Sequence, residues 1–132
     1  MILTWQQIPS PIVSEVLSSL DCDGVVLDTE HGSFNNETLV SCIQVVTLSG
    51  KKCFVRLAEE TVSMIRICLD SGASGLIFST VETHGQAEKI MQMCHYPNQR
   101  GTGRRGMGLV RQNKWGLDSL DVEKPVLIAQ IE

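Results

Sequence analysis

The feature that most constrains the fold is a repeated alternation of short apolar runs with segments of helical pattern. The apolar runs, each of strand length, are Ile2–Trp5, Gly24–Asp28, Cys53–Arg56, Gly75–Phe78 and Val126–Ile131. Helical patterns fill the intervals at 11–20, 36–48, 60–69 and 83–93, and a shorter one covers about 109–115. Pro11 suits a first helical position with Ser10 as its cap, and Gly50 ends the second helix. This order predicts an α/β fold in which helices cover a parallel sheet.

The chain has 132 residues, which is enough for one domain with its own core. From Asp28 to Arg56 is 28 residues and from Arg56 to Phe78 is 22, and each interval suits one βα unit. From Phe78 to Glu132 is 54 residues, so this crossover carries an insertion. We place an irregular loop insertion, rich in Gly and Arg, at 97–122.

Composition and charge exclude several classes of protein. The chain is 42% hydrophobic and 20% charged, which argues against global disorder, and its net charge of −4 argues against binding to nucleic acid or acidic lipid. No apolar run approaches ~20 residues, so we expect no membrane span. Five cysteines without a C-x-x-C motif fit reduced thiols and a cytoplasmic protein.

Charged residues stand at the carboxyl ends of three apolar runs: Asp28, Arg56 and Glu132. In a parallel sheet these ends share one edge, where functional side chains gather. One charged residue at a strand end means little, but three at equivalent ends predict a shared site. Glu132 also offers a hard oxygen donor for magnesium or manganese, although a single carboxylate does not make a metal site.

The densest cluster of reactive side chains is the segment Asp28-Thr29-Glu30-His31-Gly32. His31 titrates near neutral pH and is a candidate acid–base group, which an adjacent carboxylate would orient. A solvated acidic loop is the alternative interpretation. Glu30 is either a metal ligand or a structural acceptor, and the sequence does not decide between the two.

Two further charged residues are candidates for the site. Arg56 can bind a substrate carboxylate and stabilise an enolate oxygen, or it can form an internal salt bridge to Asp28 or Glu30, and the two uses are compatible. Asp70 closes a helix at the end where the helix dipole disfavours an anion, which indicates a partner. His31 is one candidate for that partner, and bulk solvent is the alternative.

Three other features receive more modest interpretations. Residues 101–106 match the G-x-G-x-x-G pattern, but turn-forming residues precede them where a nucleotide site needs a strand. A mobile cationic loop that covers an anionic substrate or reaches a neighbouring subunit is favoured instead, and RNA contact is a weak third option. Trp5 is expected in the core, with the floor of a pocket as the alternative. His84 and His95 are expected on the surface or at helix ends.

Taken together, these segments resemble the HpcH/HpaI aldolase and citrate lyase family, the metal-dependent class II pyruvate aldolases. The motifs that carry the resemblance occur in the family's order over nearly the whole chain: Val26-Leu27-Asp28-Thr29-Glu30-His31-Gly32, Phe54-Val55-Arg56, Leu69-Asp70-Ser71-Gly72-Ala73, Tyr96-Pro97 followed by Arg105-Gly106, and Gln130-Ile131-Glu132. The resemblance implies a (β/α)8 barrel of the TIM type and a homo-oligomer that exchanges a terminal helix. Residues 1–132 would be the N-terminal part of this single domain, a partial barrel of about five βα units.

The resemblance also implies a reaction and a role for each candidate residue. The reaction is the reversible cleavage of a 4-hydroxy-2-oxo acid to pyruvate, or a related 2-oxo acid, and an aldehyde, assisted by a divalent cation (Mg, Mn or Co). Glu132 would be the first of two carboxylate metal ligands. His31 would be the acid–base residue with Asp70 as its partner, while Arg56 would bind the pyruvate oxygens. Asp28 would lie in the substrate site beside the water shell of the metal.

The chain departs from the family pattern in ways that affect these expectations. Ser79-Thr80 stands where the family often has Pro, and the loop before Arg105 is about two residues longer. The second metal ligand, an Asp in the family, would lie one strand beyond Glu132, so the isolated chain is expected to bind metal poorly. The alternative is a non-catalytic binding or assembly module, in which the exposed edge of an open half-barrel needs a partner.

Overall fold

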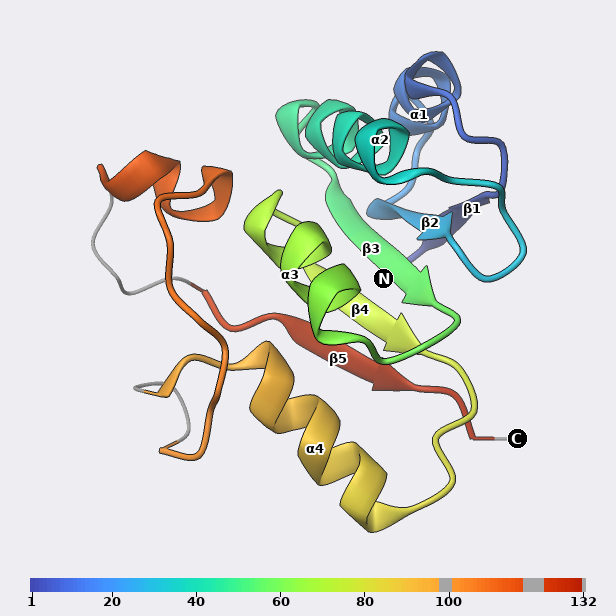
Figure 1. Cartoon of the computed structure of the whole chain (residues 1–132). Helices are drawn as coiled ribbons and strands as arrows, with labels where there is room; N and C mark the ends of the chain where they lie inside the picture. The colour runs from blue at the N-terminus through green and yellow to red at the C-terminus, as the bar shows by residue number, and fades with distance from the viewer. Residues whose placement is uncertain (98–100, 118–122, 132) are drawn as a thin grey trace.

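The computed structural model describes residues 1–97, 101–117 and 123–131, and it confirms the predicted α/β alternation (Figure 1). The strands are β1 (Leu3–Gln6), β2 (Gly24–Asp28), β3 (Lys52–Leu57), β4 (Gly75–Phe78) and β5 (Val126–Ala129). The helices are α1 (Pro11–Ser18), α2 (Asn36–Leu48), α3 (Val62–Asp70), α4 (His84–Cys94) and the 3-10 helix η1 (Arg111–Gly116). The second and fourth strands and the second helix have the predicted bounds.

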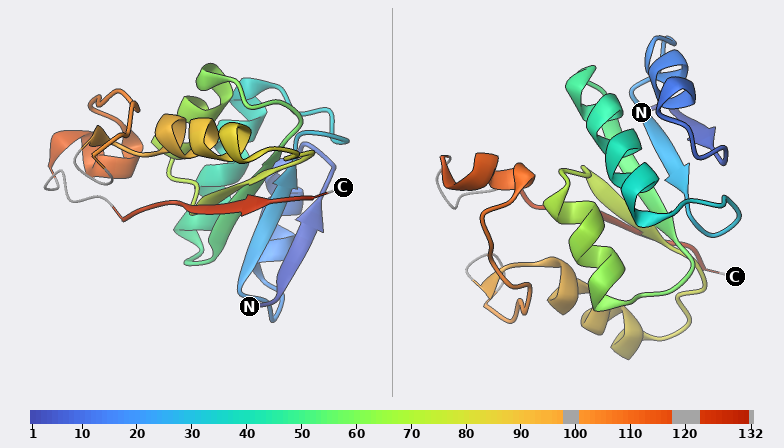
Figure 2. Two further views of the ribbon diagram at one scale, coloured as in Figure 1. Left: turned by 90° about the horizontal axis from the view of Figure 1, so that it is seen from below. Right: turned by 45° about the horizontal axis from the view of Figure 1, so that its top comes forward.

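The five strands form one all-parallel sheet in the order β1-β2-β3-β4-β5. This is the arrangement of consecutive βα units in a parallel barrel, and Figure 2 shows the sheet curving with the helices along its outer side. The register sets Asp28 opposite Arg56 on β2 and β3. The carboxyl ends of all five strands therefore lie along one edge.

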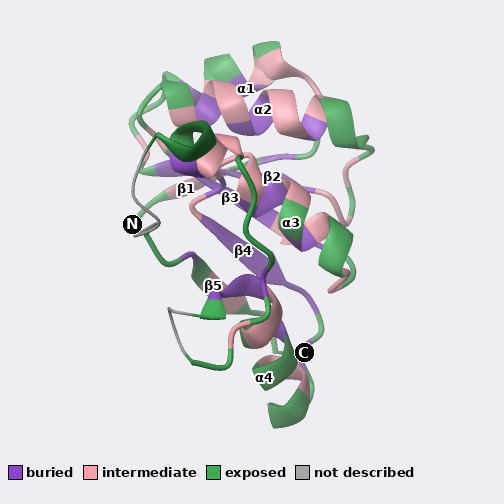
Figure 3. Ribbon diagram, turned by 60° about the vertical axis from the view of Figure 1, so that its left-hand side comes forward, coloured by how far each residue is buried: buried purple, intermediate pink, exposed green. Residues whose placement is uncertain are grey.

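The core lies between the sheet and the helices, and Figure 3 shows buried residues in both layers. The strand residues of this core alternate along each strand, as the pleat requires. Val25 and Leu27 of β2 face the helices, as do Val55 of β3 and Leu76 of β4, and all four are fully buried. They pack against apolar residues of α2, α3 and α4 such as Ile43, which is also fully buried. Burial of a side chain of this size is worth about 1.5–3 kcal/mol, so this layer is the main source of stability.

Three helices begin at side-chain caps placed immediately after loops from the carboxyl edge. Asn35, Thr61 and Thr83 precede α2, α3 and α4, and the side-chain oxygen of each accepts a hydrogen bond from a backbone N–H in the first turn. Ser10 occupies the corresponding position before α1 as predicted, but its side chain makes no capping bond. Pro11 begins this helix instead, where its missing N–H costs nothing.

The opposite face of the sheet carries a second, smaller apolar cluster. Val26, Phe54 and Ile77 are buried there, with Leu3 and Ile128 packed against them. Asp28 and Arg56 follow Val26 and Phe54 by two residues on the same face, because side chains alternate along a strand. This face would be the interior of a closed barrel, and the charged pair lies at its carboxyl rim.

Residues 101–110 have neither helix nor strand structure, and η1 follows them. The predicted helix at 109–115 is a 3-10 helix in which Lys114 and Trp115 have φ of 48° and 56°. In the described residues, no helix has the length and apolar character needed to cross a bilayer.

Candidate functional site

The site is built around a bidentate ion pair between residues of neighbouring strands. Arg56 donates from Nε to Oδ1 of Asp28 at 2.9 Å and from NH2 to Oδ2 at 2.6 Å. The Asp28 side chain has no exposed surface and that of Arg56 is 12% exposed. Parallel bonds of this kind are the strongest geometry for a guanidinium and a carboxylate, and the register of β2 and β3 forms them directly.

The Asp28 carboxylate accepts hydrogen bonds from five residues. Besides Arg56, Oδ2 accepts from the indole N–H of Trp5 at 3.1 Å and from Nε2 of Gln7 at 3.0 Å. Oδ1 accepts from the backbone N–H groups of Glu30 at 3.1 Å and His31 at 3.2 Å. Burial by itself raises the pKa of Asp28, but the hydrogen bonds from Arg56, Gln7, Trp5 and His31 outweigh burial and hold the pKa well below its ordinary value. Asp28 is therefore an ionised anchor that organises the site.

The loop after β2 folds back over this anchor. Gly32 donates its N–H to the backbone oxygen of Asp28 at 3.0 Å, and a Cβ at this position would lie 2.3 Å from that oxygen and 2.7 Å from the backbone oxygen of Gln7. Only glycine permits this approach. Through this turn, the His31 backbone contacts Asp28 while its side chain is exposed, with no hydrogen-bond or ion-pair partner among the described residues.

Glu30 adds a second carboxylate to Arg56. Its Oε2 lies 2.9 Å from NH1 of Arg56, a buried ion pair that lacks hydrogen-bond geometry. Both internal salt bridges that the sequence allowed for Arg56 are therefore present. Asp28 and Glu30 together orient the Arg56 guanidinium, which lies 5.0 Å from the centre of the Trp5 ring.

Two members of the site come from β1 and the residue that follows it. Trp5 was expected in the core, but it is 45% exposed and its indole N–H contacts Asp28, so the core assignment is wrong. Gln7 was not predicted at all. The available signal was its spacing, since residues 5 and 7 share one face of an extended segment that pairs with β2.

Asp70 is not brought to this cluster. It ends α3 at the amino-terminal edge of the sheet, because a helix that follows one parallel strand must return to the start of the next. Its Oδ1 accepts a hydrogen bond from NH2 of Arg105 at 2.6 Å. Asp70 therefore has a partner, as expected. Within the described residues that partner is Arg105 and not His31.

Arg105 is buried in the molecule. Its residue surface is 3% exposed, its NH2 also donates to Oε1 of Gln112 at 2.6 Å, and its guanidinium stacks over Tyr96 at 4.5 Å. The segment 101–106 therefore packs one of its arginines inside the molecule, although Arg104 is exposed. As expected, no strand leads into this segment in the described residues, which removes the context of a dinucleotide site.

The remaining histidines divide between surface and interior. His84 is exposed at the start of α4, where its Nδ1 lies 3.8 Å from Oε2 of Glu88. His95 is only 3% exposed, and its Nδ1 lies 2.8 Å from the backbone oxygen of Met91. The surface assignment of His84 is confirmed, whereas His95 lies at a helix end but is buried.

Glu132, the predicted metal ligand, lies outside the described residues. The described residues contain no group of three or more His, Cys, Asp and Glu side chains that could hold a metal ion. Asp28 is taken up by protein donors, and near the same edge the buried Oε2 of Glu30 and Oε1 of Gln130 have no hydrogen-bond partner. These oxygens suit a polar group beside the site, but the described side chains alone do not form a metal centre.

Comparison with known proteins identifies the relatives of this chain. The family model described as HpcH/HpaI aldolase/citrate lyase matches residues 2–132. A hydroxypyruvate/pyruvate aldolase of Rhizorhabdus wittichii is 33% identical over 92 residues, which are 70% of this chain and 37% of that protein. A 4-hydroxy-2-oxovalerate aldolase of Novosphingobium aromaticivorans is 29% identical over 113 residues, which are 85% of this chain and 42% of that protein.

The fold has a close counterpart among solved structures. The crystal structure of an HpcH/HpaI aldolase/citrate lyase family protein from Burkholderia cenocepacia superposes with a TM-score of 0.88 at 22% identity, covering 98% of this chain and 54% of that one. The chain thus spans about half, or less, of the length of these relatives. The observed sheet is the arc of a TIM-type barrel, and the predicted fold class is confirmed. The chain belongs to the HpcH/HpaI aldolase/citrate lyase family.

Proposed function

We propose that this chain supplies the 2-oxo acid binding half of an aldolase, a carbon–carbon lyase that cleaves a 4-hydroxy-2-oxo acid to pyruvate, or a related 2-oxo acid, and an aldehyde. The observation that carries the proposal is the fixed Asp28–Arg56–Glu30 network at the carboxyl rim, with the exposed His31 on the adjoining loop. The names of relatives, among them a pyruvate aldolase and a 4-hydroxy-2-oxovalerate aldolase, support the choice of reaction.

We further propose that residues 1–132 form the amino-terminal part of a single (β/α)8 domain, with 97–122 as a loop insertion. Support comes from the relatives, of whose length the chain spans about half, and from the five-stranded arc. The two outer strands, β1 and β5, each pair with one neighbour in the described sheet. Closing the barrel would cover both edges, and a homo-oligomer is the proposed assembly.

Arg56 is the proposed binding group for the substrate. Its guanidinium is oriented by two carboxylates, so its charge and direction are fixed before substrate arrives. A 2-oxo acid presents a carboxylate and a keto oxygen, and the keto oxygen becomes negative when the carbon–carbon bond breaks. A preorganised cation beside that oxygen stabilises the enolate more than the ground state, which is the condition for catalysis.

His31 is the proposed acid–base group. In the cleavage direction, its imidazole would accept the proton of the 4-hydroxyl while the bond between the third and fourth carbons breaks and its electrons move to the keto oxygen. The aldehyde then leaves, and protonation of the third carbon gives pyruvate. The backbone bond from His31 to Asp28 holds the residue at the rim while the side chain stays accessible. Asp28 is a positioning residue in this scheme, because a substrate contact would displace one of its present bonds.

The family relation supports dependence on a divalent metal ion, with magnesium, manganese or cobalt as candidates. Such an ion would polarise the keto oxygen of the substrate. Glu132 is the proposed ligand from this chain, and further ligands must come from beyond the described residues, where no ligand cluster is formed. Arg56 and His31 act on the substrate itself, so their roles can be tested without the metal.

A titration of the isotope-labelled chain with pyruvate, followed by nuclear magnetic resonance, tests the binding role. We expect pyruvate to shift the Arg56 Nε–H and Trp5 indole resonances, and Arg56→Gln to abolish the response. Acetone, which lacks the carboxylate, is the matched control and should leave both resonances in place. Unmoved resonances at millimolar pyruvate would contradict the proposal. Turnover of 4-hydroxy-2-oxopentanoate with manganese then measures whether the chain alone is catalytic.

A non-catalytic assembly module is the second candidate, and the unpaired outer edges of β1 and β5 favour it. In that case the chain would form a stable complex through these edges and would bind pyruvate no better than acetate. Light scattering coupled to size-exclusion chromatography measures the assembly. Because the aldolase proposal also includes a homo-oligomer, ligand binding decides between the two: pyruvate binding that acetate does not match would exclude this candidate and support the aldolase proposal.

A further inference from the structure

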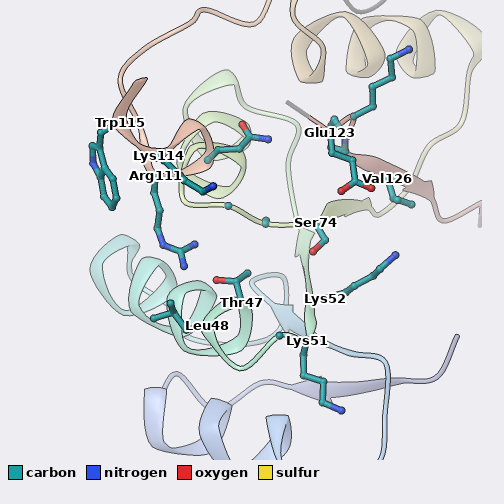
Figure 4. Close-up of a pocket in the computed structure, with 16 residues that line it drawn as sticks. Thr47, Leu48, Lys51, Lys52, Ser74, Arg111, Lys114, Trp115, Glu123 and Val126 are labelled. Carbon is teal, nitrogen blue, oxygen red and sulfur yellow. The ribbon is translucent and has the colours of Figure 1, made fainter. Parts of the chain in front are cut away.

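A pocket of about 800 Å³ lies at the amino-terminal edge of the sheet, far from the rim that holds Arg56. Its walls come from the end of α2, the segments that lead into β3, β4 and β5, and η1 (Figure 4). This is the edge at which parallel barrels do not carry out chemistry, so the aldolase reaction gives no reason for a polar pocket here.

The pocket concentrates the positive charge of an acidic chain. The chain has a net charge of −4, yet four of its five lysines and one arginine line this one pocket: Lys51, Lys52, Lys114, Lys124 and Arg111. Glu123 is the one acidic residue among the described lining residues. Cations grouped around a concave surface raise the local concentration of anions.

Helix ends account for only part of this charge. Helix carboxyl termini attract cations, and Lys51 donates to the backbone oxygens of Leu20 and Cys22 near the end of α1, at 3.1 and 2.6 Å. Arg111 donates from NH1 to the backbone oxygen of Ser71 at 2.8 Å. The Lys52 side chain, in contrast, has no hydrogen bond or ion pair with the described residues, and its backbone N–H donates to Asp23 at 3.1 Å.

The side chains of η1 present donors to the pocket. Figure 4 shows Arg111 and Lys114 extending from η1 into the space between it and α2, with Ser74 on the far side. Beyond the bond from its NH1, the Arg111 guanidinium has Nε and NH2 as further donors. Gln112 also lines the pocket, and because its Oε1 accepts from Arg105, its amide NH2 is left as a donor. A surface of this kind, rich in N–H donors, suits an oxyanion.

We propose that this pocket binds a phosphate group, either as inorganic phosphate or as a phosphate monoester. Phosphate offers several acceptor oxygens, which match the donors of Arg111, Lys114 and Gln112. Inorganic phosphate also keeps a hydroxyl group near neutral pH, and Glu123 on the opposite wall can accept a hydrogen bond from it (Figure 4). Bound phosphate would link η1 to the start of β5, so occupancy should stabilise the fold.

Isothermal calorimetry and thermal unfolding of the 132-residue chain test the proposal. We expect inorganic phosphate to raise the midpoint of unfolding more than potassium chloride does at equal ionic strength. Glycerol 3-phosphate is the second probe, and tighter binding of one of the two distinguishes a free ion from an ester as the natural ligand. A response to both phosphates no larger than the response to chloride would overturn the proposal.

Three variants locate the site. Lys114→Gln and Arg111→Gln should each weaken phosphate binding about tenfold or more, since each removes a charge-assisted bond. Lys89→Gln on α4, the lysine outside the pocket, is the matched control and should bind as the unmodified chain does. Arg111→Gln also loses the bond to Ser71, so circular dichroism must first show that this variant folds. If it does not fold, the affinity of Lys114→Gln for phosphate tests the proposal. Unchanged affinity in a folded Lys114→Gln variant would contradict the proposal.

Discussion

Arg56 holds Asp28 through two bonds of 2.9 and 2.6 Å between adjacent parallel strands, where the carboxylate has no contact with solvent. The same guanidinium lies 2.9 Å from the Glu30 carboxylate. The Arg56 guanidinium thus pairs with two carboxylates, and these two contacts fix its orientation. This relationship makes the rim a rigid, preorganised site and leads to the first two predictions.

Replacing Arg56 with lysine should disable the site even though the charge is kept. Lysine offers a point charge that cannot contact both oxygens of Asp28 and also Glu30, so the orientation of the cation is lost. We expect affinity for pyruvate to fall about tenfold or more, and the free energy of unfolding to fall by about 1–3 kcal/mol. Titration with pyruvate and urea unfolding measure the two effects. Arg66→Lys, on the exposed side of α3, is the control and should change neither.

The Asp28 carboxylate should make stability depend on pH. Because its pKa in the folded chain lies below its ordinary value, its stabilising effect is complete above the unfolded pKa near 4 and is lost as the pH falls below that value. We expect Asp28→Asn to be less stable than the unmodified chain by about 1–3 kcal/mol at pH 7, since it weakens the two charge-assisted bonds to Arg56 while the ion pair with Glu30 remains. The difference should shrink toward pH 3. Urea unfolding at pH 7, 5 and 3 checks this, and a difference that stays constant would contradict it.

The elements of the fold could be read from the sequence because local signals agree with the global pattern. Gly24–Asp28 and Asn36–Leu48 have the predicted bounds, since an unbroken apolar run marks the strand and Gly50 follows the end of the helix. The first strand was predicted to end at Trp5, but it ends at Gln6. Gln6 is polar and nevertheless buried, since Ser14 of α1 donates to its Oε1 at 2.8 Å. The apolar pattern of the strand does not contain this contact with the helix that follows.

The site was predictable where strand register determined it and not where loops did. Asp28 and Arg56 end neighbouring strands, so their meeting followed from the parallel sheet. Gln7 carries no charge and follows a short strand, so its spacing from Trp5 was the one signal that pointed to it before its bond to Asp28 was seen. The predicted pairing of Asp70 with His31 does not form within the described chain. A helix between parallel strands ends at the amino-terminal edge, whereas His31 follows a carboxyl end.

The pair of Asp70 and Arg105 should contribute to stability. Arg105 is buried, so Asp70→Asn would leave its charge with only neutral acceptors. Because the Asp70 side chain is 29% exposed, we expect a moderate loss of about 1–3 kcal/mol in the free energy of unfolding. Urea unfolding measures the loss, and Asp21→Asn at an exposed site is the control. Equal stability of the two variants would show that this pair is energetically neutral.

The buried cysteines should be unreactive toward alkylating reagents in the folded chain. All five are free thiols, and Cys42, Cys53, Cys68 and Cys94 lie in the main core, where burial raises the pKa of each. The pKa of Cys68 and that of Cys94 rise to about 12, so almost no thiolate exists at pH 8. We expect iodoacetamide to modify only Cys22 at pH 8, and all five cysteines in urea, as measured by peptide mass spectrometry. Rapid modification of Cys68 under native conditions would mean that the layer between the sheet and α3 opens readily, contrary to the packing described above.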